Sequence, residues 1–397
     1  HFAHAEGHMQ LVSLEWLPLF VLLWYVTITR PRPLAAAAAA LALFAVVLCD
    51  YYYMFYGVLF GILAVVWQGA RLRRPLFLLS REYRAAIGVF VAVSLLTAGP
   101  LVISLLLLGR SEQLIGIHET LDNSLDLLAV LVPGGHWRYA GLTEAYWSKL
   151  PGFIHESSVY LGVSMLGLLG FVWARRRAAP LPAAGLWFGT FAFFLVLSLG
   201  PVMHVWGAAV GPYALPYAWL ESIFPPLAMS GVPVRMMVMV TLALSVIAAA
   251  GFKMLLAGSG TTRFVAILLL ALVTVEYLPR PIPASALSTP PYVSVLAGLK
   301  DDKGVLDTVA NRTLVLYYQT VHQKPIAMGY VSRLPKSVAD VDFQETELFE
   351  RRDYAALRRD FGLRYLVTRP DFEAAAPGVA VKLLYSGPDA RVWDLGE

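Results

Sequence analysis

Apolar residues gather in eight runs within the first 280 residues, and charged residues, prolines or aromatic side chains separate these runs. A transmembrane helix needs roughly 20 apolar residues, and a shorter run reaches across a bilayer with help from tilt or flanking aromatic residues. The pattern predicts an α-helical polytopic membrane domain over residues 1–279, with both of its ends on one side. The expected spans are residues 11–29, 34–49, 54–67, 85–108, 158–174, 183–199, 235–256 and 264–278.

Basic residues follow an alternating pattern between these runs. Twelve Lys and Arg residues lie in or beside every second connection, at 30–33, 69–84, 175–177 and 258–263. The positive-inside rule therefore predicts that these connections are cytoplasmic. The connections 50–53, 109–157 and 200–234 are then external, together with both termini. Of the twelve Asp and Glu residues before residue 280, only Glu82 lies on the cytoplasmic side.

The composition changes after Pro279. Residues 280–291 are rich in proline, serine and alanine and predict a linker. Residues 292–397 contain fourteen basic and fifteen acidic residues, which indicates a small soluble domain. Apolar spacing predicts a helix over 344–361 that stops at Gly362, and strands over 364–368, 379–385 and 391–395. We therefore expect a small α/β domain, located outside the membrane.

Composition and charge exclude several classes of protein. Hydrophobic residues make up 58% of the chain and charged residues 15%, which is typical of a membrane protein. The net charge of +4 comes from basic residues that flank the spans, so it gives no sign of nucleic-acid binding. A single cysteine, Cys49, excludes an internal disulfide framework and a multi-cysteine metal site. Because the chain begins with His1 and has no recognisable leader, we expect a piece of a longer or processed protein.

Ionisable side chains within a membrane span are costly and usually face a cavity or a partner. Here these are Glu15, Arg235 and Glu276, with Asp50 at a span end, and all four lie near the predicted outer boundary. One interpretation is a water-filled pocket that opens outward and is ringed by these residues. The alternative is that Glu15 and Glu276 lie at interface depth, where they are solvated or paired with an arginine.

The external segment 200–234 interleaves six prolines with aromatic residues. Proline breaks a span and aromatic residues prefer the headgroup layer, so we expect a short interfacial helix at about 215–224. Pro233 then starts the next span, and Arg235 places a guanidinium near its N-terminus, an arrangement suited to a phosphate. The alternative is an arginine that anchors the span to lipid headgroups. His204, in the same segment, is a further candidate for substrate binding.

Histidines pair with glutamates in the long external loop, as His118-Glu119 and His155-Glu156. Such pairs suit acid–base catalysis or metal ligation, although their sequence alone favours ordinary solvated loop residues. Glu119 and Asp50 are retained as candidate catalytic acids. Three N-terminal histidines with a glutamate between them have a spacing that suits a divalent metal, but no metal site is assigned. These residues are His1, His4, Glu6 and His8.

Several short phrases together resemble a group of bacterial polytopic proteins, the glycosyltransferases of the C superfamily. The phrases lie at residues 7–10, 15–19, 50–53, 156–162, 215–217, 233–235, 276–279, 317–322 and 329–333. The resemblance implies a multi-span helical bundle in the bacterial cytoplasmic membrane, an external soluble domain and a polyprenyl-phosphate sugar as donor. It also implies that Arg235 meets the donor phosphate. The superfamily's catalytic acid usually lies in the first external loop, a region that we expect to precede this chain's first residue.

The resemblance implies sugar transfer outside the cytoplasmic membrane. A carboxylate deprotonates an acceptor, which displaces the polyprenyl phosphate, while Arg235 stabilises the departing charge. Cofactor use stays open, with a divalent ion such as Mg²⁺ or Mn²⁺ as the candidate. The expected partners are the lipid-linked donor and membrane lipids. Two other classes remain: a transporter or flippase for a lipid-linked or polar solute, and a non-enzymatic envelope protein.

Overall fold

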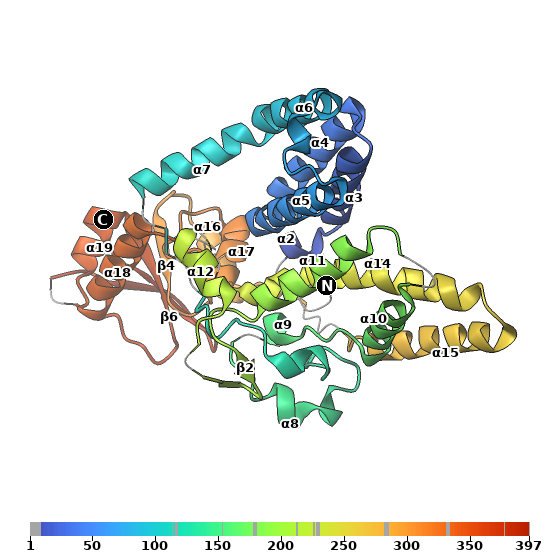
Figure 1. The fold of residues 1–397 in the computed structure, drawn as a ribbon. Helices are drawn as coiled ribbons and strands as arrows, with labels where there is room; N and C mark the ends of the chain where they lie inside the picture. The colour runs from blue at the N-terminus through green and yellow to red at the C-terminus, as the bar shows by residue number, and fades with distance from the viewer. Residues whose placement is uncertain are drawn as a thin grey trace. The chain divides into compact units, whose positions relative to one another are not determined.

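The computed structural model describes most of the chain and is predominantly helical (Figure 1). It divides into two compact units: His1–Leu108 with His118–Pro283, and Gly109–Ile117 with Ala284–Glu397. The predicted linker at 280–291 contains the boundary between them. The residues described are 9–112, 114–115, 118–152, 154–177, 181–211, 213–224, 227, 231–281, 286–330, 334–376 and 378–396.

All eight predicted runs form helices in the described structure, but most of these helices are shorter than a perpendicular span. Among the described residues, only α5 (Tyr51–Leu72) and the continuous helix Pro233–Leu256 are long and apolar enough on their own to cross a membrane. The pair α6 (Arg81–Thr97) and α7 (Gly99–Ser111), bent by 53°, makes a third candidate. The main helices are α3 (Trp16–Thr29), α4 (Pro33–Cys49), α5 (Tyr51–Leu72), α6 (Arg81–Thr97), α7 (Gly99–Ser111), α10 (Val163–Arg175), α11 (Ala184–Ser198), α14 (Met237–Leu256) and α15 (Gly260–Glu276).

The expectation of eight spans therefore goes further than the structure, which has two or three candidates. Local backbone chemistry accounts for the shortening. The single helix predicted at 85–108 is broken at Gly99-Pro100, where proline can begin a new helix but cannot continue the old one. Gly162, with φ of +81°, delays the start of α10. α3, α4, α10 and α11 remain as shorter apolar helices.

Glycine allows α3 to pack closely against α5. A Cβ atom added at Gly57 would lie 3.2 Å from Cε1 of Phe20, so only a hydrogen fits there without a shift. One turn further on, the indole Nε1 of Trp24 donates to the carbonyl of Gly61 over 3.2 Å. Small residues four apart let two membrane helices approach each other. In the other half of this unit, α14 packs against α10, α11 and α15.

Shorter elements build the loops of the same unit. They are α2 (Met9–Val12), η1 (Phe77–Leu79), η2 (Leu127–Val130), η3 (Ala140–Leu142), α8 (Glu144–Trp147), α9 (Ile154–Ser157), β2 (His204–Val205), β3 (Ala208–Ala209), α12 (Pro216–Ile223) and η4 (Pro233–Met236). The helix expected at about 215–224 is thus present as α12. It buries Tyr217 and leaves Trp219 and Ile223 exposed, so one face of α12 is apolar and uncovered.

The second unit is an α/β domain around a four-stranded sheet with the order β4-β6-β8-β7. β4 and β6 are parallel, and β8 pairs antiparallel with both β6 and β7. The short strand β1 (Leu114–Ile115) pairs with β5. The other elements are α16 (Pro291–Gly298), β4 (Gly304–Asp307), α17 (Arg312–His322), β5 (Leu334–Pro335), α18 (Lys336–Glu350), α19 (Tyr354–Phe361), β6 (Leu363–Thr368), β7 (Lys382–Ser386) and β8 (Arg391–Asp394).

Alternating residues of the four-stranded sheet contribute to two hydrophobic cores, one on each face of the sheet. Val305 packs with α16 and α17 on one face, while its neighbour Leu306 packs with α19 on the other. The predicted helix at 344–361 is in fact two helices, because the Asp353 side chain accepts from the N–H of Ala356 and starts α19 anew. The predicted stop at Gly362 is confirmed, since this residue adopts φ of +69° after α19.

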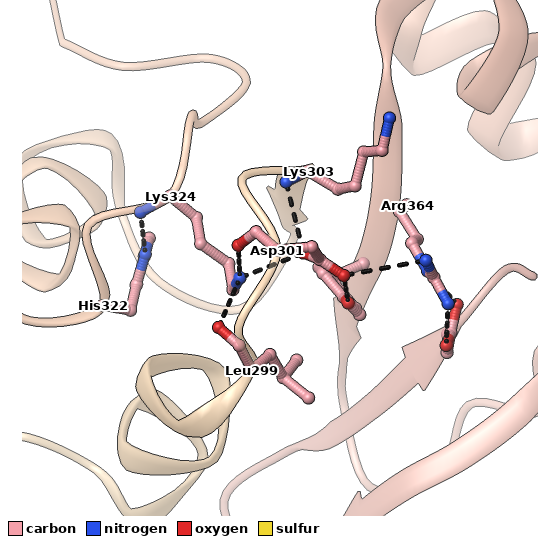
Figure 2. Close-up of polar contacts among 8 residues, drawn as sticks. Leu299, Asp301, Lys303, His322, Lys324 and Arg364 are labelled. Atoms are coloured by element: carbon pink, nitrogen blue, oxygen red, sulfur yellow. Dashed lines mark hydrogen bonds and ion pairs between the residues drawn. The ribbon is translucent and has the colours of Figure 1, made fainter. Parts of the chain in front are cut away.

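A buried lysine joins the ends of several elements in this domain (Figure 2). Lys324 is 2% exposed. Its Nζ donates to the carbonyl of Leu299 (3.1 Å), which follows α16, and to the carbonyl and the Oδ1 of Asp301 (2.5 and 3.1 Å). Burial, and secondly the Lys324 charge, lower the pKa of His322, whose Nδ1 accepts from the N–H of Lys324. All three ammonium protons of Lys324 are used by the fold, so this cluster is structural.

Replacing Lys324 by methionine should loosen the domain. The change leaves Asp301 and two partly buried carbonyls without their donor, and because Asp301 is 31% exposed the cost should lie below the ~3–5 kcal/mol of a fully buried ion pair. Hydrogen exchange of the α16 and β4 amides in the whole protein measures this loss. Lys303→Met, which removes an exposed ammonium from the same loop, is the matched control and should change little.

α18 turns two acids toward the domain interior, Asp342 and Glu345. Asp342 accepts from Arg312 Nη1 over 2.7 Å. Burial, with a smaller contribution from Asp342, raises the pKa of Glu345 to about 7. The folded domain therefore binds a proton at Glu345 that the unfolded chain releases near its ordinary pKa of 4.5.

This shift predicts a pH-dependent stability. The stabilising contribution is complete below pH 4.5 and is lost as the pH rises through 7, because ionised Glu345 must then stay buried. Glu345→Gln should protect α18 at pH 8 by roughly 1–3 kcal/mol and have little effect at pH 5. Hydrogen exchange at the two pH values, corrected for intrinsic rates, is the measurement. If Glu345→Gln changes the protection of α18 equally at pH 5 and pH 8, the prediction is wrong. Glu350→Gln, which alters an exposed side chain of α18, is the control.

Candidate functional site

The first unit contains a cavity of about 760 Å³, which is large enough for a ligand of substantial size. One wall is a face of α3 that includes Leu17, Val21 and Tyr25, and the opposite wall is a face of α14. Leu22 lines the cavity and is also 56% exposed. The cavity therefore reaches the outer surface of the helices beside α3.

The α14 wall is apolar along its length, even where it carries hydroxyl groups. Lining residues run from Met237 to Val246 along one helix face, a length of about 14 Å at the rise of an α-helix. The hydroxyl of Thr241 donates to the carbonyl of Met237 (2.9 Å), and that of Ser245 donates to the carbonyl of Thr241 (2.8 Å). Because the helix itself uses these donors, the wall suits a hydrocarbon chain.

Charged groups are confined to one end of the cavity, where Arg235 pairs with Glu156. Nε of Arg235 lies 3.1 and 3.2 Å from the two carboxylate oxygens, and Nη2 lies 2.5 Å from Oε1. The side chains of Arg235 and Glu156 are 5% and 3% exposed. A guanidinium and a carboxylate that share two hydrogen bonds offset much of each other's desolvation cost. The pair is therefore a buried charge centre in an otherwise apolar cavity.

The local sequence explains how these two residues meet. Pro233 occupies the first turn of η4, which continues into α14, so Arg235 lies at the very start of the long helix Pro233–Leu256. The N–H of Val234 donates to the carbonyl of Asn123, which attaches this turn to the long loop between α7 and α10. The same loop supplies α9, which packs against η4 and carries Glu156.

Glu276 lines the same cavity from the C-terminal end of α15. Its two carboxylate oxygens accept from the N–H of Ser164 over 3.1 and 3.2 Å, so Glu276 caps the first turn of α10. The neighbouring Tyr277 hydroxyl donates to the carbonyl of Leu161 (2.6 Å). Gly162 lies between these contacts at φ +81°, and a Cβ atom there would lie 3.0 Å from Glu276 Oε2. The phrases at 156–162 and 276–279 therefore pack against each other.

A loop strand brings a histidine to this end of the cavity. The backbone N–H of Arg138 donates to the carbonyl of Leu278 over 2.8 Å, and the backbone N–H of Arg280 donates to the carbonyl of His136 over 3.0 Å. His136, 8% exposed, lines the cavity, as does Tyr277. Arg235, Glu156, Glu276 and His136 thus all line one cavity, and four separate segments contribute them.

The other predicted site residues lie elsewhere. Asp50 accepts from the N–H groups of Tyr52 and Tyr53 (2.8 and 3.1 Å) and so caps α5, although it is near enough to Arg235 to interact electrostatically. Glu15 and Glu119 are exposed and do not line the cavity. His204 is 5% exposed and borders a separate space of only about 10 Å³, which holds at most one water molecule. Their proposed roles remain predictions.

Sequence reasoning gave Glu156 and His136 too little weight. Glu156 belongs to a His-Glu pair for which the alternative interpretation is an ordinary solvated loop residue, yet it is only 3% exposed. Its position at the start of the recurring phrase 156–162 was the signal that could have singled it out. Asp126 was not selected either. It accepts from Leu128 N–H, Tyr146 Oη–H and Gly207 N–H at 2.9, 2.7 and 2.7 Å, so its role is structural.

Metal ligation finds no support in the described part of the chain. No group of three or more His, Cys, Asp or Glu side chains there is arranged to hold an ion. The N-terminal set His1, His4, Glu6 and His8 lies outside the described residues. Cys49 is a partly buried free thiol.

Breaking the buried pair should cost more than removing it. Arg235→Met alone leaves the Glu156 carboxylate in an apolar site and should destabilise the protein by about 3–5 kcal/mol. Arg235→Met combined with Glu156→Leu removes both charges and should recover most of this loss. Thermal unfolding in detergent, followed by tryptophan fluorescence, tests the difference. A double variant as unstable as the single one would show that packing, and not charge, holds the two residues.

Comparison with known proteins leaves this site to be interpreted from its own chemistry. No protein-family model, no curated protein and no solved structure matches the chain.

Proposed function

We propose that this protein is a membrane glycosyltransferase that takes a sugar from a polyprenyl-phosphate donor on the outer side of a bacterial cytoplasmic membrane. The buried Arg235–Glu156 pair at the polar end of a long apolar cavity carries the proposal. A prenyl-phosphate sugar has the matching three parts: a hydrocarbon chain, an anionic phosphate and a polar sugar.

Each part of this donor has a complementary region in the cavity. The hydrocarbon chain follows the apolar faces of α3 and α14, and it reaches the lipid past the exposed Leu22. The phosphate meets Arg235, whose planar guanidinium suits phosphate oxygens. The sugar lies toward Glu276 and His136, where hydrogen-bonding groups gather. In the transfer step, Arg235 stabilises the negative charge that develops on the departing phosphate.

The helix ends support the proposed sidedness. α14 and α15 pack together and are joined only by residues 257–259, so they run in opposite directions (Figure 1). Arg235 and Glu276 therefore lie at one end of this pair, and Lys253 and Arg263 lie at the other. The positive-inside rule puts the Lys253 end in the cytoplasm and the cavity's polar end outside. The proposal retains eight membrane-crossing segments, several of them short or tilted.

A transporter or flippase is the main alternative. A transport path needs polar groups near the middle of the bilayer. The polar groups of this cavity lie at helix ends, and the mid-helix hydroxyls of Thr241 and Ser245 bond to their own helix. A purely structural envelope protein has no need of a cavity with a buried charge pair. These features favour an enzyme that acts at the membrane surface.

Sugar transfer by the complete protein should depend on the guanidinium group of Arg235. The assay uses liposomes, a panel of radiolabelled prenyl-phosphate hexoses and pentoses, and envelope membranes as acceptor, with and without a chelator. Arg235→Gln should lower transfer about 10²–10³-fold, as for other losses of a charge-stabilising donor. Arg235→Lys should recover part of the rate because it keeps the charge.

Arg263→Gln, at the opposite end of the α14–α15 pair, is the control and should transfer normally. If Arg235→Gln transfers sugar at the rate of the unmodified protein, the phosphate does not bind at Arg235. If no donor of the panel is used while a labelled solute crosses the bilayer, the transporter is correct.

A further inference from the structure

Arg235 holds Glu156 through only part of its hydrogen-bonding capacity. Nε and Nη2 donate to the Glu156 carboxylate, and in the described structure Nη1 donates to no protein atom. Arg235 is also the one basic side chain of Lys or Arg type that lines the described cavity, which Glu156 and Glu276 line as well. A ligand anion that enters must therefore share this guanidinium with Glu156 or take it over.

The balance of charge favours a takeover. The Arg235–Glu156 pair is neutral as a whole, so a phosphate that enters gives this end of the cavity a net negative charge. Like charges in a buried site repel strongly, because little water screens them. A phosphate also offers several oxygens to the fork of an arginine, whereas the carboxylate offers two. The carboxylate that loses its cation then holds a proton more readily.

We propose that the donor phosphate displaces Glu156 from Arg235, and that the released Glu156 is the catalytic base that accepts the proton of the acceptor hydroxyl. This inference rests on the proposed function. The acceptor O–H bond breaks and its proton goes to a Glu156 oxygen. The acceptor oxygen forms a bond to the anomeric carbon, and the bond from that carbon to the phosphate oxygen breaks. Its electron pair leaves with the prenyl phosphate, which Arg235 binds.

The other ionisable groups around Glu156 suit this role less well. Glu276 from α15 is held by the backbone N–H of Ser164, which a ligand cannot remove. Asp50 is held in the same way at the start of α5. Tyr53 of α5 and His136 of the external loop also line the cavity. Neither side chain is a carboxylate that forms an ion pair with Arg235. Glu156 thus has a partner that an anionic ligand can compete for.

Dicyclohexylcarbodiimide measures the exchange directly, because it modifies protonated carboxyl groups in apolar surroundings. The complete protein in detergent at pH 7 is treated with and without farnesyl phosphate, and the labelled peptides are quantified by mass spectrometry. Farnesyl phosphate should raise labelling of Glu156 about tenfold for each unit by which its pKa rises. Farnesol, which has the chain without the charge, should not. Labelling of Glu276 is the internal reference and should stay constant.

Sugar transfer then tests the role as base. Glu156→Gln keeps an acceptor for Arg235 and should bind farnesyl phosphate while kcat falls about 10²–10⁴-fold. Glu156→Asp should recover part of the rate and move the acidic limb of the pH profile. Glu144→Gln, an exposed change in α8, is the control.

The outcomes separate the two proposals. Unchanged labelling of Glu156 with farnesyl phosphate overturns the exchange, whatever the enzyme's activity. If farnesyl phosphate increases the labelling of Glu156 but Glu156→Gln transfers sugar at the normal rate, Glu156 is not the catalytic base. If the unmodified protein transfers no sugar from any donor, the proposed function fails, and with it the base, while the labelling still decides whether an anion displaces Glu156.

Discussion

The Arg235–Glu156 pair is the constraint on which the first unit depends. Neither charge is stable alone in a cavity with apolar walls, so the turn that carries Arg235 and the loop that carries Glu156 must stay together. This requirement fixes residues 154–157 against the start of α14 although 79 positions separate the two residues. The long loop between α7 and α10 is thereby folded onto the start of α14.

The same logic governs other acids of this unit. Asp50, Asp126 and Glu276 each accept from backbone N–H groups that a helix start or a turn leaves without a partner. A carboxylate bound in this way satisfies donors that would be costly to leave unpaired in an apolar protein. Their concentration near the predicted outer boundary therefore has a structural cause.

The sequence predicted the helices and the small α/β domain because each leaves a local signature: apolar runs and alternating strand residues. It also predicted eight spans, of which the described residues show two or three candidates, since helix length depends on backbone breaks such as Gly99-Pro100 and on the contacts of Gly162. The role expected of Arg235 rests on a charge after Pro233 and stays a prediction. Glu156 and His136 could not be selected locally. Their burial arises from contacts with α14 and with residues 278–280, which are distant in the chain.

The nature of its partner distinguishes Glu156 from the capping acids. A backbone N–H belongs to the fold and cannot leave a carboxylate without unwinding a helix turn. A guanidinium on a side chain can move to a competing anion without such unwinding, and here it borders the space in which a ligand would lie. In an apolar cavity, a change of partner for one arginine changes the proton affinity of one carboxylate. In the proposed exchange, the site couples the arrival of an anion to the chemistry of a neighbouring acid.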